Sequence, residues 1–366
     1  VLVYSLLPES AAGLNGEEIV LGTAGRATAG LAVWMAIWWL TEATSIYATA
    51  LLPLALMPLL GASTIKETAG AYAHPLIFLF LGGFILALAL EKWHLHRRFA
   101  VTVLKLIGTK PATLVGGFMF ISATLSMWIT NTATTLVMLP ILLSIIGLLD
   151  KSSPHRKNFS LCLLLGVAYA ASIGGIGTII GTVPNMFTVS FIQNELGTDI
   201  SFAKWMTIGL PIVIVFVPLV WWLLTHWIYP PGDDEVGQEF LDEKPEPWSV
   251  GAKLTLTIFL LTAACWICRP LLMKWPPLAN LSDTGIAIIA ALLLFSIPVN
   301  LKQREFLMDW DTALRVPWGV LLLFGGGLAL AGAIRANGVG ELLASQLSSL
   351  HGVPPLLMTM MVVSFM

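Results

Sequence analysis

Long apolar segments separated by short polar stretches run through almost the whole chain. A helix needs about 20 apolar residues to cross the hydrocarbon core of a bilayer. This pattern predicts spans at residues 27–41, 46–60, 75–90, 201–229, 250–267, 284–299 and 317–334, with a partial span at 1–7. Glu42 is interpreted as the end of the first full span rather than as an ion relay, and an acidic connector occupies 230–247. We expect an all-α polytopic membrane protein.

Two uncharged runs do not fit one span each. Residues 111–149 contain no charged side chain, and as a single helix they would be about 58 Å long, nearly twice the bilayer core. The polar stretch 126–135 lies in the middle of this run. Residues 158–194 are also uncharged, with a Gly-rich and Pro-containing centre at 171–185. Irregular backbone survives at membrane depth only where protein or a water-filled cavity satisfies it, so the pattern predicts a re-entrant hairpin and a discontinuous helix at a transport site.

An internal repeat supports this interpretation. The Gly-rich segment 80–84 recurs at 324–328, an offset of 244, and the same offset aligns Pro111 with Pro355. The first linker after this segment is rich in Lys and Arg, whereas residues 336–351 have neither, and five expected crossings separate the two linkers. Basic loops tend to be cytoplasmic, so we expect inverted repeats. The counterpart of 130–132 would fall near 374–376, so the second half of the site is expected beyond Met366.

The composition excludes other classes of protein. Of 366 residues, 57% are hydrophobic and 11% charged, with a mean hydropathy of +0.85, whereas an average soluble domain has about 25% charged residues. A soluble enzyme is therefore excluded, and a net charge of −2 without a basic stripe argues against nucleic-acid binding. An intramembrane enzyme would need a nucleophile–base or metal pair, and an ion channel a ring of carbonyls or charges. The sequence suggests neither.

The two polar centres offer neutral oxygen ligands. Thr130, Asn131 and Thr132 supply two hydroxyls, an amide and unpaired backbone groups at the expected hairpin tip. Helix N-termini there would suit a carboxylate, while helix C-termini and unwound carbonyls would suit Na⁺. In the second centre, Thr178 and Thr182 supply oxygens. Ser, Thr and Asn also join helices in lipid without any other function, but their concentration in two uncharged runs favours a binding site.

These motifs resemble those of the divalent anion/sodium symporters, a family that carries di- and tricarboxylates or sulfate. The resemblance rests on SMWITNTATTLVMLP at 126–140, GGIGTIIGTVPN at 174–185, WLTEATSIYATALLP at 39–53 and PWGVLLLFGGG at 317–327. The family usually has Ser where this chain has Thr130, a change that keeps a hydroxyl and a backbone carbonyl.

The resemblance implies a homodimeric, elevator-type transporter in a bacterial inner membrane. Residues 1–74 and 201–316 would be scaffold helices, 75–200 the first repeat of the transport domain, and 317–366 the start of the second. Na⁺ would be held by Ser126, Thr130, Asn131 and Gly181, and a substrate carboxylate by Asn131, Thr132, Thr182 and Pro184. The expected activity is Na⁺-coupled symport of C4-dicarboxylates such as succinate, malate or fumarate, without an organic cofactor. A Na⁺-independent exchanger and a citrate or sulfate carrier remain the alternatives within the family.

Overall fold

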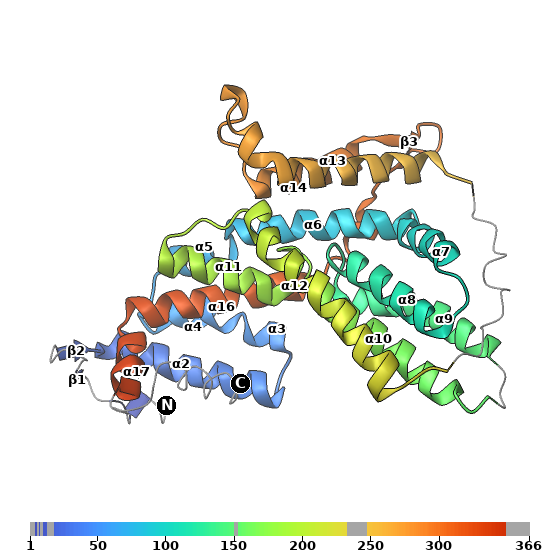
Figure 1. The fold of residues 1–366 in the computed structure, drawn as a ribbon. Coiled ribbons are helices and arrows are strands. Elements are labelled where there is room, and N and C mark those ends of the chain that lie inside the picture. The colour runs from blue at the N-terminus through green and yellow to red at the C-terminus, as the bar shows by residue number, and fades with distance from the viewer. Residues whose placement is uncertain are drawn as a thin grey trace. The chain divides into compact units, whose positions relative to one another are not determined.

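The computed structural model describes residues 4–5, 7, 10–12, 18–149, 153–232 and 247–348. The chain divides into two compact units, one made of Val1–Ile77 with Trp318–Met366 and the other of Phe78–Pro317. Both are built almost entirely of helices (Figure 1). The expectation of an all-α membrane protein is confirmed, with two short antiparallel strand pairs as the only strands in the described residues.

The first unit contains the two ends of the described chain. Its elements are β1 (Ser10–Ala12), β2 (Glu18–Val20), α2 (Gly22–Thr41), α3 (Ile46–Thr49), α4 (Leu52–Leu59), α5 (Ile65–Tyr72), α16 (Trp318–Ala336) and α17 (Val339–Ser348). Glu42 follows α2 in a left-handed conformation, with φ 48°, and is exposed, so it does mark the end of this helix. The span expected at 46–60 forms an apolar helical segment, Ile46–Leu59, with a two-residue turn between α3 and α4. The turn lies just before Pro53, which has no N–H to donate to it.

The second unit contains the two uncharged runs. Its elements are α6 (Pro75–Lys92, whose first turn belongs to the other unit), α7 (Leu95–Ile107), α8 (Pro111–Ser126), α9 (Asn131–Leu148), α10 (Arg156–Gly175), α11 (Val183–Leu196), α12 (Phe202–Leu223, continued by a π-helical turn at Leu224–Ile228), α13 (Val250–Leu272), a 3₁₀ turn (Pro276–Leu278), α14 (Asp283–Ser296), β3 (Pro298–Asn300), β4 (Glu305–Phe306) and α15 (Trp310–Ala313). Both runs are broken near their centres, as predicted.

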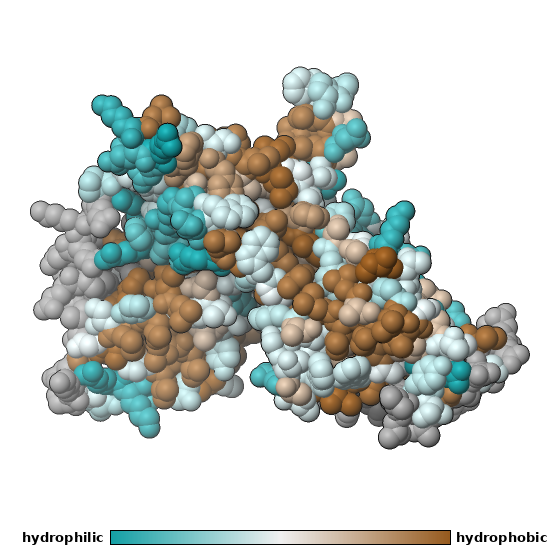
Figure 2. Space-filling view, turned by 180° about the vertical axis from the view of Figure 1, so that it is seen from behind, coloured by the Kyte–Doolittle hydropathy of each residue, from teal (hydrophilic) through white to brown (hydrophobic). Residues whose placement is uncertain are grey.

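Length and apolar composition allow five helices in the described residues to cross a membrane. They are Ile65–Lys92 (α5 and α6 taken as one helical segment), Arg156–Gly175, Phe202–Ile228, Val250–Leu272 and Trp318–Ala336. Large apolar side chains stay exposed on several of them, such as Ile214 at 68% and Leu261 at 61%. Hydrophobic residues cover much of the surface shown in Figure 2. Apolar surface on this scale is expected where lipid tails, rather than water, surround the helices.

The core of the second unit lies among α8, α9 and α10. Phe118, Met138 and Phe159, one from each helix, are fully buried there. The helices α8 and α10 meet backbone to backbone, because a methyl group added at Gly174 would overlap Ala123. Small residues at such a crossing are typical of helix packing in membranes. This close contact brings the breaks in the two uncharged runs together.

Helix boundaries recur at the offset of the sequence repeat. The helices α6 and α16 end at Lys92 and Ala336, and α7 and α17 begin at Leu95 and Val339, each pair 244 residues apart. Between them, His94 and Gly338 are likewise 244 residues apart, and both have positive φ, 53° and 73°. The copies therefore share the same order of parts. Their inverted orientation stays a prediction.

Candidate functional site

The hairpin tip is a sharp break between α8 and α9. The helix α8 ends at Ser126 and α9 begins at Asn131. Thr130 is the N-cap of α9, and its hydroxyl oxygen accepts a hydrogen bond from the Ala133 N–H at 3.3 Å. The buried Ser126 hydroxyl donates to the Asn131 side-chain oxygen at 2.6 Å, which closes the turn. The local sequence thus stops one helix and caps the next.

The second break separates α10 from α11. The last residue of α10 is Gly175, and α11 begins after its N-cap Thr182. The carbonyl groups freed by the break find donors in side chains. The Asn185 amide donates to Gly175 O at 2.8 Å and to Thr178 O at 2.7 Å, and the Trp205 indole N–H donates to Ile176 O at 2.9 Å. Unwound backbone at membrane depth requires such partners.

The two breaks lie against each other. The Thr178 hydroxyl donates a hydrogen bond to the Met127 carbonyl in the hairpin tip. A methyl group added at Gly175 would lie 2.5 Å from the Asn131 side-chain oxygen and 3.3 Å from Cβ of Thr182. One added at Gly181 would overlap the Gly175 carbonyl oxygen and lie 2.9 Å from Ser126 O. Only glycine fits at these two positions, so polar groups from both breaks converge there.

Four helix ends therefore meet at this point. The C-termini of α8 and α10, at Ser126 and Gly175, present carbonyl groups that do not continue the helical hydrogen bonding, and they carry partial negative charge. The N-termini of α9 and α11, next to Thr130 and Thr182, carry N–H groups and partial positive charge. Charged side chains are absent from both breaks. The arrangement can stabilise a small cation at the carbonyl ends and an anion at the N–H ends.

The predicted site residues occupy distinct places in this arrangement. The structure brings together Ser126, Asn131, Gly181 and Thr182, of which Thr182 makes no capping hydrogen bond. Thr130 lies between Ser126 and Asn131, but its hydroxyl is used as a helix cap. Thr132 and Pro184 are exposed, at the second position of α9 and of α11. These two residues therefore lie at the edge of the site where the four helix ends meet.

Sequence reasoning missed three residues that hold the breaks in place. Gly175 and Asn185 fell within the second motif without being singled out, and Trp205 lay outside both uncharged runs. A signal for Asn185 did exist, because a polar amide within an apolar run needs partners. Nothing in the sequence linked Trp205 on α12 to the break.

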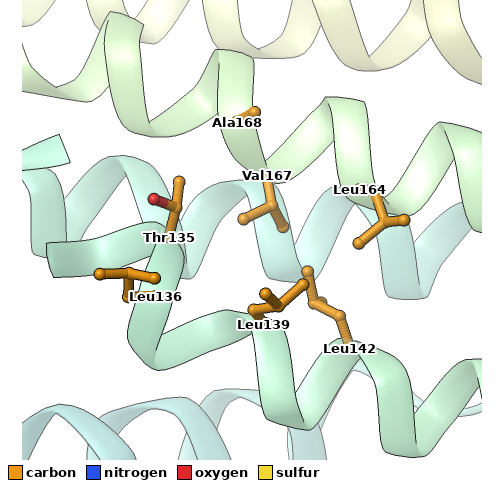
Figure 3. A pocket seen from close by; sticks show the side chains of 7 residues that line it. All are labelled: Thr135, Leu136, Leu139, Leu142, Leu164, Val167 and Ala168. Atoms are coloured by element: carbon orange, nitrogen blue, oxygen red, sulfur yellow. The ribbon is translucent and has the colours of Figure 1, made fainter. Parts of the chain in front are cut away.

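A cavity of about 210 Å³ opens between α9 and α10, next to the hairpin tip. Figure 3 shows its lining, Thr135, Leu136, Leu139 and Leu142 from α9 and Leu164, Val167 and Ala168 from α10. The Thr135 hydroxyl already donates to Asn131 O and Thr132 O, at 3.1 and 2.9 Å. The walls are otherwise apolar. This cavity lacks the polar partners that an anion requires, so the candidate site is the convergence of helix ends.

Comparison with known proteins identifies the family of the chain. The family model described as "Citrate transporter" matches residues 36–366. The "Sodium-dependent dicarboxylate transporter SdcS" of Staphylococcus aureus, in strains USA300, COL and N315 among others, is 41% identical over 341 residues, 89% of this chain and 65% of that protein. The chain thus spans a little under two thirds of the length of these relatives. By its motifs, its apolar helices and the family match, the chain belongs to the citrate transporter family, within the divalent anion/sodium symporters, and is a multi-pass membrane protein of a transporter family rather than an enzyme.

Proposed function

We propose that the protein is a Na⁺-coupled symporter of C4-dicarboxylates, such as succinate, malate or fumarate, in a bacterial inner membrane. The observation that carries the proposal is the convergence of two helix C-termini and two helix N-termini at Gly175 and Gly181. Partial charges of both signs in one place suit a cation and an anion that bind together. SdcS is named as a sodium-dependent dicarboxylate transporter, which supports the same function.

Na⁺ is assigned to the carbonyl side of the convergence. The available ligands are the Ser126 and Asn131 side chains and the backbone oxygens of Ser126, Thr130 and Gly181. All are neutral hard oxygens, which suit Na⁺. The Ser126 carbonyl lies close to Gly181, and the Ser126 hydroxyl holds the Asn131 oxygen at 2.6 Å, so these groups fit one small cation. Thr130 contributes through its carbonyl, because its hydroxyl caps α9.

The substrate is assigned to the N–H side. Asn131 and Thr132 at the start of α9, with Thr182 and Pro184 at the start of α11, would bind one carboxylate. The Thr182 hydroxyl does not cap α11, so it can donate a hydrogen bond to the carboxylate. Neutral donors allow release, whereas a buried Arg would hold the anion more tightly. The other carboxylate would contact the second repeat.

Transport would follow an elevator movement in a homodimer. In this proposal residues 75–200 and the repeat that starts at 317 move as the transport domain against scaffold helices at 1–74 and 201–316. The Trp205 hydrogen bond to Ile176 O then lies at the boundary between moving and fixed parts. Because Trp205 lies on α12, the movement would have to break or stretch this bond between α12 and the broken helix.

Uptake by the intact protein in proteoliposomes tests the function. Labelled succinate should enter saturably with an inward Na⁺ gradient and much more slowly when K⁺ replaces Na⁺. Asn131→Ala should abolish uptake, while Asn158→Ala, on the far end of α10, should leave it intact. Equal uptake with and without Na⁺ would refute the coupling, and uptake that needs unlabelled dicarboxylate inside the vesicles would identify an exchanger.

Citrate is the second candidate substrate, because the matching family model is described as a citrate transporter. Competition separates the two. Excess malate or fumarate should suppress succinate uptake strongly, and citrate or sulfate should do so weakly. Strong competition by citrate alone would reassign the substrate class. A unitary current in a planar bilayer would instead indicate an ion channel.

A further inference from the structure

Asn185 spans the break between α10 and α11. It is the third residue of α11 and is only 5% exposed. A polar side chain at the third helical position commonly reaches back to cap its own helix. The Asn185 amide instead donates to two carbonyls of the preceding segment, Gly175 O at 2.8 Å and Thr178 O at 2.7 Å. One side chain therefore uses both of its N–H donors to tie the two halves of the broken helix together.

Both acceptors are part of the convergence of helix ends. Gly175 packs against the Asn131 side-chain oxygen and against Gly181. Thr178 is joined to the hairpin tip, since its hydroxyl donates to Met127 O. A continuous path of hydrogen bonds thus runs from Gly175 through Asn185 and Thr178 to Met127. This path fixes the distance between the carbonyl ends of α8 and α10.

We propose that Asn185 is a positioning residue for sodium. It holds Gly175 in place, and Gly175 packs against the Asn131 and Gly181 oxygens that would bind Na⁺, so Asn185 sets the geometry of these ligands without touching the ion. The inference rests on the proposed function and extends it to a residue outside the ligand set. A small cation needs oxygens at fixed short distances, and partners outside the ligand shell commonly orient those oxygens. The six residues 176–181 are non-helical and have turn hydrogen bonds such as Gly177 N–H to Gly174 O at 2.8 Å, and the two bonds from Asn185 add a tie from the next helix.

The side-chain chemistry allows a sharp substitution. Asn185→Asp keeps the shape, but a carboxylate only accepts hydrogen bonds and would face two carbonyl oxygens. Asn185→Ser is milder, because it fits the space and keeps one donor. Asn158→Asp is the matched control, since the half-buried Asn158 at the other end of α10 donates its amide to Pro230 O at 3.3 Å.

The experiment measures the Na⁺ concentration for half-maximal succinate uptake by the intact protein in proteoliposomes. Asn185→Asp should raise it about 10- to 100-fold, the usual cost of losing a partner outside a metal's ligand shell. Asn185→Ser should fall between Asp and wild type. At saturating Na⁺ the succinate KM should stay near the wild-type value, because a positioning residue for the cation does not contact the anion. Asn158→Asp should match wild type.

Each other result has a distinct meaning. Wild-type uptake without Na⁺ dependence would refute the proposed function itself. Na⁺-dependent wild-type uptake with unchanged Na⁺ affinity in Asn185→Asp would overturn only the role of Asn185. A rise in succinate KM alone would also overturn it and place Asn185 at the anion. Failure of both Asn185 variants to fold, with Asn158→Asp folded, would make Asn185 a folding residue and overturn the positioning role.

Discussion

The Ser126 hydroxyl and the Asn131 side-chain oxygen are 2.6 Å apart, and this hydrogen bond joins the end of α8 to the start of α9. It occupies one lone pair of the amide oxygen and leaves the other directed away from Ser126. The same oxygen packs against Gly175 of the broken helix. One short contact thus sets both the turn of the hairpin and the position of a predicted Na⁺ ligand.

Replacing Ser126 by Ala should weaken sodium binding. The Asn131 oxygen loses its donor and its orientation, so the Na⁺ concentration for half-maximal uptake should rise about tenfold or more. Stability should fall by about 1 kcal/mol, the typical worth of such a hydrogen bond. Ser160→Ala is the control, because that hydroxyl donates within α10 to Arg156 O at 2.8 Å. If Ser126→Ala and Ser160→Ala have the same Na⁺ dependence of uptake, the Ser126 hydroxyl has no role in Na⁺ binding.

Replacing Gly181 by Ala should abolish transport. The added methyl group would overlap Gly175 O and lie 2.9 Å from Ser126 O, so the two breaks would be forced apart. Gly147→Ala in α9 meets nothing within 4 Å and should be neutral or stabilising by about 0.5–1 kcal/mol. Uptake and melting temperature of both purified variants check this contrast. An active Gly181→Ala protein would contradict the close approach of the breaks.

Thr130 should act as a helix cap and through its carbonyl. Thr130→Ser keeps the capping oxygen and should preserve uptake, whereas Thr130→Val should lower stability by about 1 kcal/mol. Ser201→Ala removes the equivalent cap of α12, which accepts from Lys204 N at 3.2 Å. If the Thr130 hydroxyl acts only as a helix cap, Thr130→Val and Ser201→Ala should lower the melting temperature by similar amounts, and both should keep the wild-type Na⁺ dependence of uptake. A Na⁺ affinity loss confined to Thr130→Val would show that the hydroxyl itself binds the ion.

His94 should carry backbone strain that its counterpart Gly338 lacks. His94 precedes α7 with φ 53°, a conformation that costs a side-chain-bearing residue about 1–2 kcal/mol. His94→Gly should therefore raise the melting temperature, and Gly338→Ala, at φ 73°, should lower it. Thermal unfolding in detergent measures both. A lower melting temperature for His94→Gly together with a higher one for Gly338→Ala would contradict a left-handed residue between the two helices in each copy.

Asp309 should contribute stability that disappears at low pH. Burial alone would raise the pKa of Asp309, but hydrogen bonds from Lys92 and from the Thr312 N–H and hydroxyl outweigh it and lower the pKa from 3.8 to about 2. The folded pKa lies below the unfolded one, so the stabilisation is present above about pH 4 and is lost as pH falls towards 2. The Asp309 side chain is 46% exposed, so the effect should stay below about 1 kcal/mol.

Asp309→Asn tests this window, because Asn keeps the capping oxygen of α15 and removes the charge. The melting temperature of wild type should exceed that of Asp309→Asn at pH 6, and the difference should shrink steadily as pH falls from 4 towards 2. A difference that does not change with pH would mean that the Lys92 pair adds no charge-dependent stability.

The sequence by itself determined the class of protein and the places where its helices break. Uncharged runs too long for one crossing, with polar centres at 126–135 and 171–185, predicted the breaks after Ser126 and Gly175, because bilayer thickness limits helix length. It also indicated the repeat at offset 244, and the helix ends agree with that offset. Local pattern was enough for the breaks because the length of an uncharged run and its polar centre depend only on neighbouring residues, whereas the repeat was found by comparing distant segments of the sequence. The local pattern did not predict the turn between α3 and α4 within 46–60, which lies next to Pro53.

Only the tertiary structure decided which polar groups meet. Ser126, Asn131 and Gly181 lie up to 55 residues apart in the chain, and their convergence depends on the backbone contact of Gly174 with Ala123. Asn185 and Trp205 gained their roles in the same way, since each donates to a carbonyl that exists as a free acceptor only because α10 ends. A hydrogen bond between distant segments leaves no periodic trace in either one. Its partners become known only when packing brings the two segments together.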